Sequence, residues 1–271
     1  MHPIERLRYV ARAGGVDLVE LVQDAAGALS GFASDPAALV TACRSLIDRH
    51  PSAGPVWWLA ARVLCAADPG AEAWQAADDL EQDQTARAVL RHVPADSTAL
   101  VVGWPTTVAG GLVRRGDCRL LVVDAGGSFG FRADRLGRYD LDIEHIPEAG
   151  VASASVAADL VVIEAQALGD DGFVAAIGAR AAAAVAVDAG IPVWVVAPVG
   201  RVLPRELWRA LAARVDAAPA PWGEPDEMVP LRLVTSVLRS DGLHEPAEVV
   251  TAPDCPFAPE LLRRLDAPGS W

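Results

Sequence analysis

The chain has 271 residues, of which 52% are hydrophobic, so it can form one large or two modest domains with a substantial core. A net charge of −13 and a pI of about 4.7 argue against direct binding of DNA or RNA, which needs a basic surface. The longest apolar runs, such as residues 181–187, are too short to cross a bilayer. Residues 1–15 lack the apolar core of a signal peptide. We therefore expect a cytoplasmic protein with no membrane or nucleic-acid partner.

The use of basic and metal-binding residue types limits the chemistry further. Every basic residue other than His is Arg, and Asn is also absent, which is typical of a GC-rich genome because Lys and Asn use AT-rich codons. Without Lys, neither a Schiff base nor a P-loop lysine can form. The four Cys show no C-x-x-C spacing and the His residues are scattered, so we expect buried free thiols and neither metal nor cofactor.

The first part of the chain, residues 1–95, is predicted to be a helical domain. Its apolar residues recur at helical spacing, and Asp68-Pro69-Gly70 interrupts the pattern. One helix is expected to begin after Ser34 or Asp35 as N-cap, with Pro36 in its first turn.

Residues 96–271 are predicted to be a Rossmann-like α/β domain, because short continuous apolar runs alternate with helical segments. One helix is expected around residues 173–189, an edge strand within 228–250, and a short last helix at 258–265. The expected strands lie within residues 98–103, 118–125, 141–146, 159–165 and 192–198. In such sheets ligands bind beyond the carboxyl ends of the strands.

The loop after the first of these strands carries Thr106 and Thr107 at a predicted helix start. Their hydroxyls and the free amides there could form an anion subsite, or one threonine could merely cap its helix. The loop after the second strand is glycine-rich but lacks dinucleotide spacing, so Gly126 and Gly127 are expected to form a tight turn. Arg132 is then the nearest residue that could pair with a phosphate.

The loop after the strand within 159–165 carries Glu164, Gln166, Asp170 and Asp171. Glu164 is either a general base whose pKa is raised by burial, or a carboxylate that accepts from backbone amides. Gln166 would orient a substrate. The two aspartates are interpreted as caps of the following helix, with Asp171 kept as a candidate ligand-binding residue.

A turn in the helical half brings together His50, Ser52 and the pair Trp57-Trp58. If this turn faces the ligand edge of the sheet, His50 and Ser52 could contact a phosphate. The alternative is that the two tryptophans pack an interdomain contact.

Three of these stretches, residues 50–64, 159–198 and 228–249, together resemble the initiation factor 2B alpha/beta/delta family, which includes the methylthioribose-1-phosphate and ribose-1,5-bisphosphate isomerases. The resemblance covers roughly residues 35–250. It implies a helical N-terminal domain on a Rossmann-like parallel sheet of the NagB/RpiA/CoA-transferase-like type, usually as a homodimer.

The chain departs from the isomerases at five anchor positions. The resemblance places Gly103 where they use a Cys, Ala175-Ala176 where they use Asn-Lys, Glu164-Ala165-Gln166 where they use Gly-Ala-Asp, Gly126-Gly127 where they use Arg-Pro, and His50 where they use Arg. Arg49 is adjacent and could substitute for that arginine. Each lost charge-assisted hydrogen bond would remove about 1.5–3 kcal/mol of ligand binding.

The sequence therefore predicts a non-catalytic member of this family that binds a small ligand, such as a phosphosugar or nucleotide, or a protein partner. The alternative is a diverged isomerase-like enzyme in which Glu164 is the general base.

Overall fold

The computed structural model describes residues 18–112, 115–125 and 142–262. Five α-helices lie within residues 18–92, the described portion of the first part of the chain. Asp35 caps the second of them, with its carboxylate accepting from the amides of Ala37 and Ala38, as expected. The helices are α2 (Leu18–Leu29), α3 (Pro36–Arg49), α4 (Gly54–Cys65), α5 (Pro69–Glu81) and α6 (Thr85–His92).

The main sheet has the order β10-β9-β7-β4-β1-β2-β3, and all its neighbouring strands are parallel except the edge pair β9 and β10. This confirms the Rossmann-like α/β class with an edge strand near the C-terminus. The strands are β1 (Thr98–Val102), β2 (Arg119–Val123), β3 (Asp142–Ile146), β4 (Leu160–Glu164), β7 (Val193–Val196), β9 (Ser236–Arg239) and β10 (Gly242–His244).

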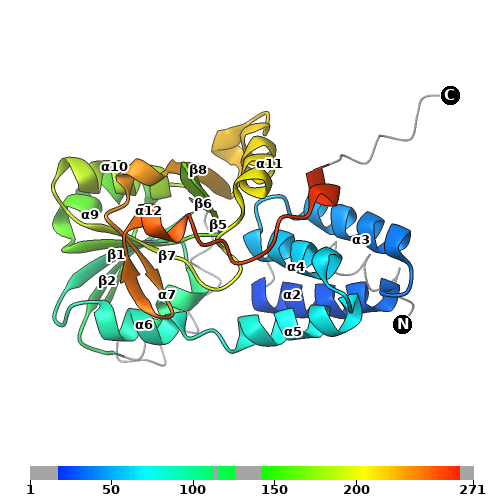
Figure 1. Ribbon diagram of the computed structural model, residues 1–271. Helices are drawn as coiled ribbons and strands as arrows, with labels where there is room; N and C mark the ends of the chain where they lie inside the picture. Colours follow the sequence, from blue (N-terminus) through cyan, green and yellow to red (C-terminus); the bar gives the residue numbers. More distant parts are fainter. Residues whose placement is uncertain (1–17, 113–114, 126–141, 263–271) are drawn as a thin grey trace.

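Helices cover both faces of this sheet (Figure 1). Leu100 and Val102 of β1 point to one face, and Ala99 and Val101 point to the other, so alternate residues of one strand enter different cores. Because both faces of the sheet are buried, nearly every residue of its central strands is apolar, which explains the continuous apolar runs in the sequence. One face carries α9 (Val151–Ala157), α10 (Ala179–Asp188) and α12 (Pro246–Val249), and the other carries α6 and α7 (Thr106–Leu112).

A second sheet of three antiparallel strands corrects one prediction. It contains β5 (Ala167–Leu168), β6 (Gly172–Ala176) and β8 (Asp226–Pro230). The helix expected around residues 173–189 begins only at Ala179, because β6 pairs along its length with β8, a partner some fifty residues away in the sequence. Asp170 and Asp171 thus precede a strand and do not cap a helix.

The helical part and the α/β part share one core. Trp208 of α11 (Arg205–Asp216) packs with Trp57 and Trp58 of α4. Ala258 and Leu261 are fully buried in the same cluster, and the segment around them ends in a 3₁₀ helix (Pro259–Leu262) against α3. The tryptophan pair therefore packs an interdomain contact. By its contacts, α6 belongs to the sheet layer, and the expected boundary at residue 95 stays a prediction.

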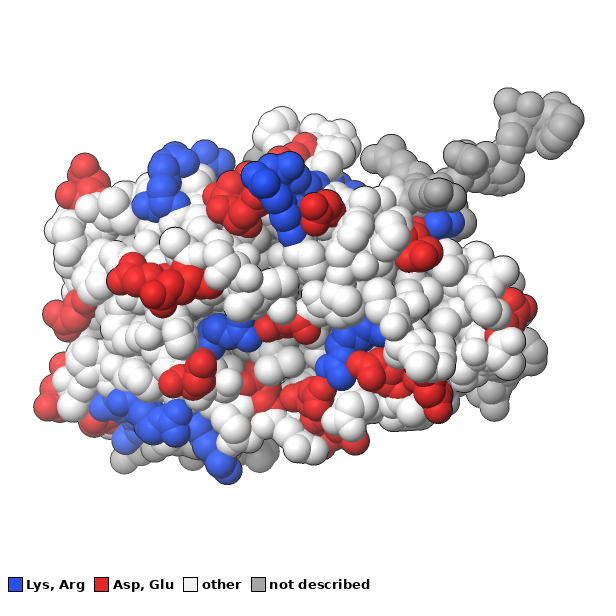
Figure 2. All heavy atoms as spheres, viewed as in Figure 1, with Lys and Arg blue, Asp and Glu red and all other residues white. Residues whose placement is uncertain are grey.

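Acidic and basic side chains lie next to one another over much of the face in Figure 2. The described residues form several ion pairs, such as Arg239 with Asp254 and Arg62 with Glu72 and Asp79. None of the helices in the described ranges is long and apolar enough to cross a membrane.

Candidate functional site

The strand order places a switch point between β1 and β4. The chain runs outward from β1 through β2 to β3, and then returns to β4 on the other side of β1. In open α/β sheets the crevice beyond such a point is the usual ligand site. Gly103, Thr106, Thr107 and Glu164 follow or end these two strands, as the sequence predicts.

Glu164 fills the crevice with its own carboxylate. The amide of Thr107 donates to Oε2 over 2.8 Å, the amide of Val108 donates to the same oxygen over 3.2 Å, and the Thr107 hydroxyl donates to Oε1 over 2.9 Å. Because α7 begins at Thr106, the two amides are first-turn groups that have no partner within their helix. Glu164 thus caps α7 from the neighbouring strand, at the place where the sequence suggested an anion subsite.

Arg201 completes the surroundings of Glu164. Its Nη2 lies 3.8 Å from Oε1, and the two side chains are only 6% and 7% exposed. Burial raises the pKa of Glu164, while Arg201 and the α7 donors oppose the rise. Three donors take up most of the roughly four lone-pair sites of this carboxylate, and its side chain is 7% exposed, so little of it is open to a substrate.

A second carboxylate occupies the start of α10. Glu227 of β8 accepts from the amide of Arg180 over 2.9 Å. The residue before this helix, Gly178, has a φ of +93° and approaches Val102 at the end of β1. The two helix N-termini nearest the switch point therefore each hold a glutamate from this chain.

Gly103, which the sequence resemblance places where the isomerases are expected to use a Cys, lies in a cluster of small residues. Gly103 has a φ of +67°, a conformation that favours glycine. A Cβ added there would lie 3.5 Å from Ala125 and 3.5 Å from Ala176. Ala175 and Ala176 belong to β6, and Gly126 and Gly127 lie outside the described residues. The described part of this cluster offers no side chain that could attack or protonate a substrate.

The helical-domain turn does meet the strand-end loop. The amide of Gly54 donates to the carbonyl of Gln166 over 3.0 Å, and the Gln166 amide donates to Val174. The Ser52 hydroxyl donates to Asp226 Oδ2 over 2.7 Å. His50 ends α3: its amide donates to Leu46, and its half-buried side chain lies at the same turn. The structure thus brings His50, Ser52 and Gln166 into one region.

Other predicted residues lie apart from it. Thr106 is exposed at the first position of α7. Asp171 accepts from the indole of Trp208 over 2.7 Å, and Asp170 pairs with Arg205 over 2.7 Å. These contacts hold α11 against the second sheet. Arg132 lies outside the described residues. A role for any of these residues in ligand binding stays a prediction.

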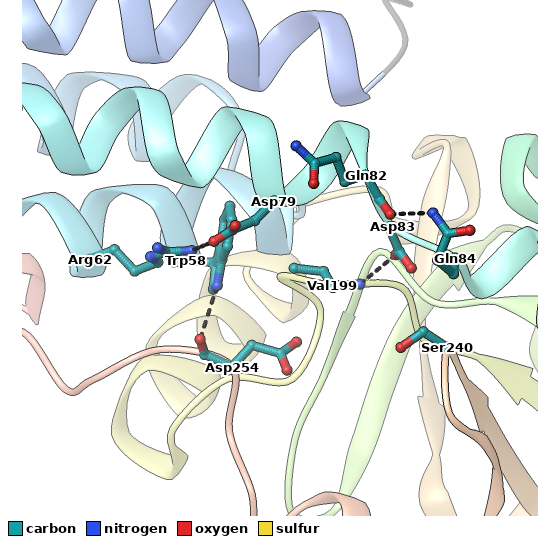
Figure 3. A pocket seen from close by; sticks show the side chains of 9 residues that line it. All are labelled: Trp58, Arg62, Asp79, Gln82, Asp83, Gln84, Val199, Ser240 and Asp254. Carbon is teal, nitrogen blue, oxygen red and sulfur yellow. Dashed lines mark hydrogen bonds and ion pairs between the residues drawn. The ribbon is translucent and has the colours of Figure 1, made fainter.

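An open cleft of about 400 Å³ lies between the helical part and the sheet (Figure 3). Several of its polar side chains are already engaged, with one another or with backbone groups. Arg62 pairs with Asp79 over 2.6 Å, Asp83 accepts from the amide of Val199, and the indole of Trp58 donates to the carbonyl of Asp254. The cleft is therefore a hydrogen-bonded interdomain joint.

Sequence reasoning missed Arg201, Asp226 and Glu227. Arg201 could have been found, because it follows the strand that ends at Val196 and so lies at the carboxyl edge of the sheet. The two acidic residues gave no signal, because they come from a strand of the second sheet that returns beside the site only in three dimensions. Among the described residues, no group of three His, Cys, Asp or Glu side chains is arranged to hold a metal ion.

No protein-family model and no curated protein matches this sequence. The fold does match solved structures. Translation initiation factor eIF-2B from Pyrococcus horikoshii OT3 has a TM-score of 0.75 at 13% identity, over 92% of this chain and 98% of that chain. A chain of the tetrameric eIF2B-beta2-delta2 complex from Chaetomium thermophilum has a TM-score of 0.74 at 17% identity, over 92% of each chain.

An enzyme shares the same architecture. The 5-methylthioribose 1-phosphate isomerase from Pyrococcus horikoshii OT3 has a TM-score of 0.62 at 15% identity, over 92% of this chain and 86% of that chain. The resemblance read from the sequence is confirmed in the fold. This chain has the two-domain fold shared by the initiation factor 2B subunits and 5-methylthioribose 1-phosphate isomerase.

Proposed function

We propose that the chain is a non-catalytic protein of this fold, which acts by binding a protein partner and does not isomerise a sugar phosphate. One observation carries the proposal: Glu164 and Glu227 occupy the helix N-termini at the switch point with carboxylates of the chain itself. An anionic substrate would have to displace them or lie beside them, and like charges at such short range repel.

The residues around the crevice support the same conclusion. Gly103, Ala125 and Ala176 provide neither a nucleophile nor an acid. Catalysis of an isomerisation needs a positioned group that moves a proton, and such groups typically contribute about 10²–10⁴-fold to the rate.

A diverged enzyme with Glu164 as general base is the second candidate. It is favoured by one observation, the rise in the Glu164 pKa through burial, which suits a base working near neutral pH. The engagement of both Glu164 oxygens opposes it.

A thermal-shift and turnover screen tests the proposal. The panel is ribose 1-phosphate, ribose 1,5-bisphosphate, methylthioribose 1-phosphate, nucleoside monophosphates, free pentoses and inorganic phosphate, with a methylthioribose-1-phosphate isomerase run in parallel to validate both assays. A bound ligand at a hundred times its Kd would stabilise the fold by about 2.7 kcal/mol. We expect no selective stabilisation and no turnover with the wild-type chain.

Turnover at an enzyme-like rate would overturn the proposal. If that turnover also disappeared in Glu164→Gln, the second candidate would replace it. Stabilisation by one phosphosugar without turnover would mean that the chain binds a small anionic ligand at the crevice. The proposed function would then be small-ligand binding and not protein binding.

We also propose a homodimer. The Chaetomium thermophilum chain with this fold belongs to a tetrameric complex, so chains of this fold associate. The resemblance to the initiation factor 2B family implies the dimer for this chain.

A further inference from the structure

A groove of about 450 Å³ opens on the side of the second sheet, away from the interdomain cleft. We call it the Trp222 groove. Its walls come from the start of α10, the end of α11, a 3₁₀ turn (Pro221–Gly223) and β8. Its apolar lining consists of Ile177, Val215, Pro221, Trp222 and Met228. A volume of this size accommodates one or two long side chains.

Trp222 is the most exposed large apolar side chain in the described part of the chain, at 81%. The others are covered more fully; Trp74, for example, is 48% exposed. Large exposed aromatic side chains beside a groove mark interaction surfaces, since Trp contributes much contact area at a small cost in side-chain entropy.

Four carboxylates surround this apolar lining, and Arg180 is the one cation among the described residues that line the groove. The acidic residues are Asp216, Glu224, Asp226 and Glu227. Within the described ranges none of the four forms an ion pair; Asp226 accepts only from the neutral Ser52 hydroxyl, and Glu227 from a backbone amide. This contrasts with the interdomain cleft, where Arg62 and Arg239 neutralise the carboxylates beside them.

The end of α11 adds to the negative potential. The last helical residue is Asp216, at the C-terminus, where the helix dipole is negative and cations are favoured. Arg214 of the same turn does not offset it locally, because its guanidinium lies over Trp57 at 4.7 Å and pairs with Asp48. Burial raises the pKa of Asp226; the hydrogen bond from Ser52 opposes the rise, and the nearby Glu224 adds to it.

We propose that the Trp222 groove is the docking site for an arginine-bearing segment of a partner protein, with the guanidinium over the Trp222 ring and among the four carboxylates. Arginine combines a planar cation that stacks on Trp with donors that suit carboxylates, and its aliphatic stem fits the apolar lining. A second copy of this chain fits less well, since each carries a net charge of −13. The inference rests on the proposed role in protein binding and names the partner's chemistry.

The test is a binding titration with a defined probe. A fluorescein-labelled peptide of alternating Arg and Leu is titrated with the full-length chain, and its anisotropy is measured. The matched peptide has citrulline in place of each Arg, which keeps the shape and removes the charge. We expect the citrulline peptide to bind at least about tenfold more weakly, and binding of the Arg peptide to weaken as NaCl is raised.

Two groove variants locate the site, Trp222→Ala and the double change Asp216→Asn/Glu224→Gln. Both should weaken binding of the Arg peptide at least about tenfold. Their matched controls lie elsewhere: Trp74→Ala removes another exposed Trp, and Asp78→Asn/Glu245→Gln removes two exposed carboxylates. These controls should stay within about twofold of wild type. Unfolding curves verify that all variants fold, which is expected because the changed side chains are exposed or line the groove.

Three outcomes would overturn the inference. The first is that the Arg peptide does not bind at all. The second is that groove variants and controls weaken binding equally, which would mean general attraction to an acidic protein. The third is that Trp222→Ala converts a dimer into a monomer in sedimentation, which would assign the groove to a second copy. The phosphosugar assay is independent of all three, so the proposed absence of catalysis and the groove can fail separately.

Discussion

Glu164 could have had two roles, and its contacts favour the structural one. A carboxylate at a strand end at the switch point is where a general base is expected. Here two first-turn amides and a hydroxyl donate to it, and Arg201 lies against it, so its charge offsets both the helix α7 amides and a buried guanidinium. Removing it would take the acceptor from the two amides and the hydroxyl, and one ion-pair partner from Arg201, in a low-dielectric environment.

Replacement of Glu164 should therefore destabilise the fold. We expect Glu164→Ala to lower the free energy of unfolding by about 3 kcal/mol, because two first-turn amides lose their acceptor and buried Arg201 loses one ion-pair partner. Glu164→Gln should cost less, since its amide oxygen can still accept from Thr107 and Val108. Urea unfolding followed by circular dichroism measures both, with the exposed Glu248→Gln as control. Unchanged stability in Glu164→Ala would mean that the carboxylate is not holding α7.

The cysteines differ in accessibility, and this too can be measured. Burial raises the pKa of the Cys43 and Cys255 thiols to about 12, and Cys118 is buried as well. Cys65 is exposed at the end of α4. We expect an Ellman titration of the native protein near pH 8 to detect about one thiol per chain, and all four after denaturation. Rapid reaction of Cys43 in the native protein would contradict the tight packing of the helical core.

At the scale of elements, a close backbone contact joins the helical part to the sheet. Helix α4 begins at Gly54, whose amide donates to Gln166 in the loop after β4. A Cβ at Gly54 would lie 2.5 Å from that carbonyl oxygen, so only glycine allows the approach. This contact brings the turn with His50 and Ser52 to the carboxyl edge of the sheet.

A methyl group at Gly54 should separate the two elements. We expect Gly54→Ala to lower the free energy of unfolding by about 1–3 kcal/mol, because the carbonyl cannot move without disturbing β5. Gly223→Ala is the control, since a Cβ there meets nothing within 4 Å. Differential scanning calorimetry of the two variants gives the comparison. Equal transition temperatures for Gly54→Ala and Gly223→Ala would show that the loop after β4 shifts to accommodate the methyl group at little cost.

The element that the sequence misassigned is β6. The alanines of β6 and α10 together predict one continuous helix, because alanine has the highest intrinsic helix propensity. Pairing of Gly172–Ala176 with β8 overrides that local preference. Local sequence patterns could not reveal this pairing, because the partner strand lies beyond α10, β7 and α11 in the chain.

At the scale of the whole molecule, association is the first property to measure. We expect sedimentation velocity at micromolar concentration to show a species of twice the 28.3 kDa chain mass. A dimer buries apolar surface that a single chain leaves in water, which is the main favourable term in such association. Dilution into the nanomolar range serves as the control for reversible association. A single 28.3 kDa species throughout would contradict the homodimer.

The sequence by itself determined the class of the fold and the order of its parts. Apolar periodicity and helix caps depend on neighbouring residues. The cap predicted at Ser34 or Asp35 is Asp35, and the predicted alternation of strands and helices is confirmed in the main sheet. Which groups occupy the crevice was decided only by the tertiary structure. Glu164 meets Thr107, Ser52 meets Asp226, and Glu227 meets the start of α10 across long stretches of chain. Such contacts arise when separate strands and helices pack together, and no local pattern encodes them.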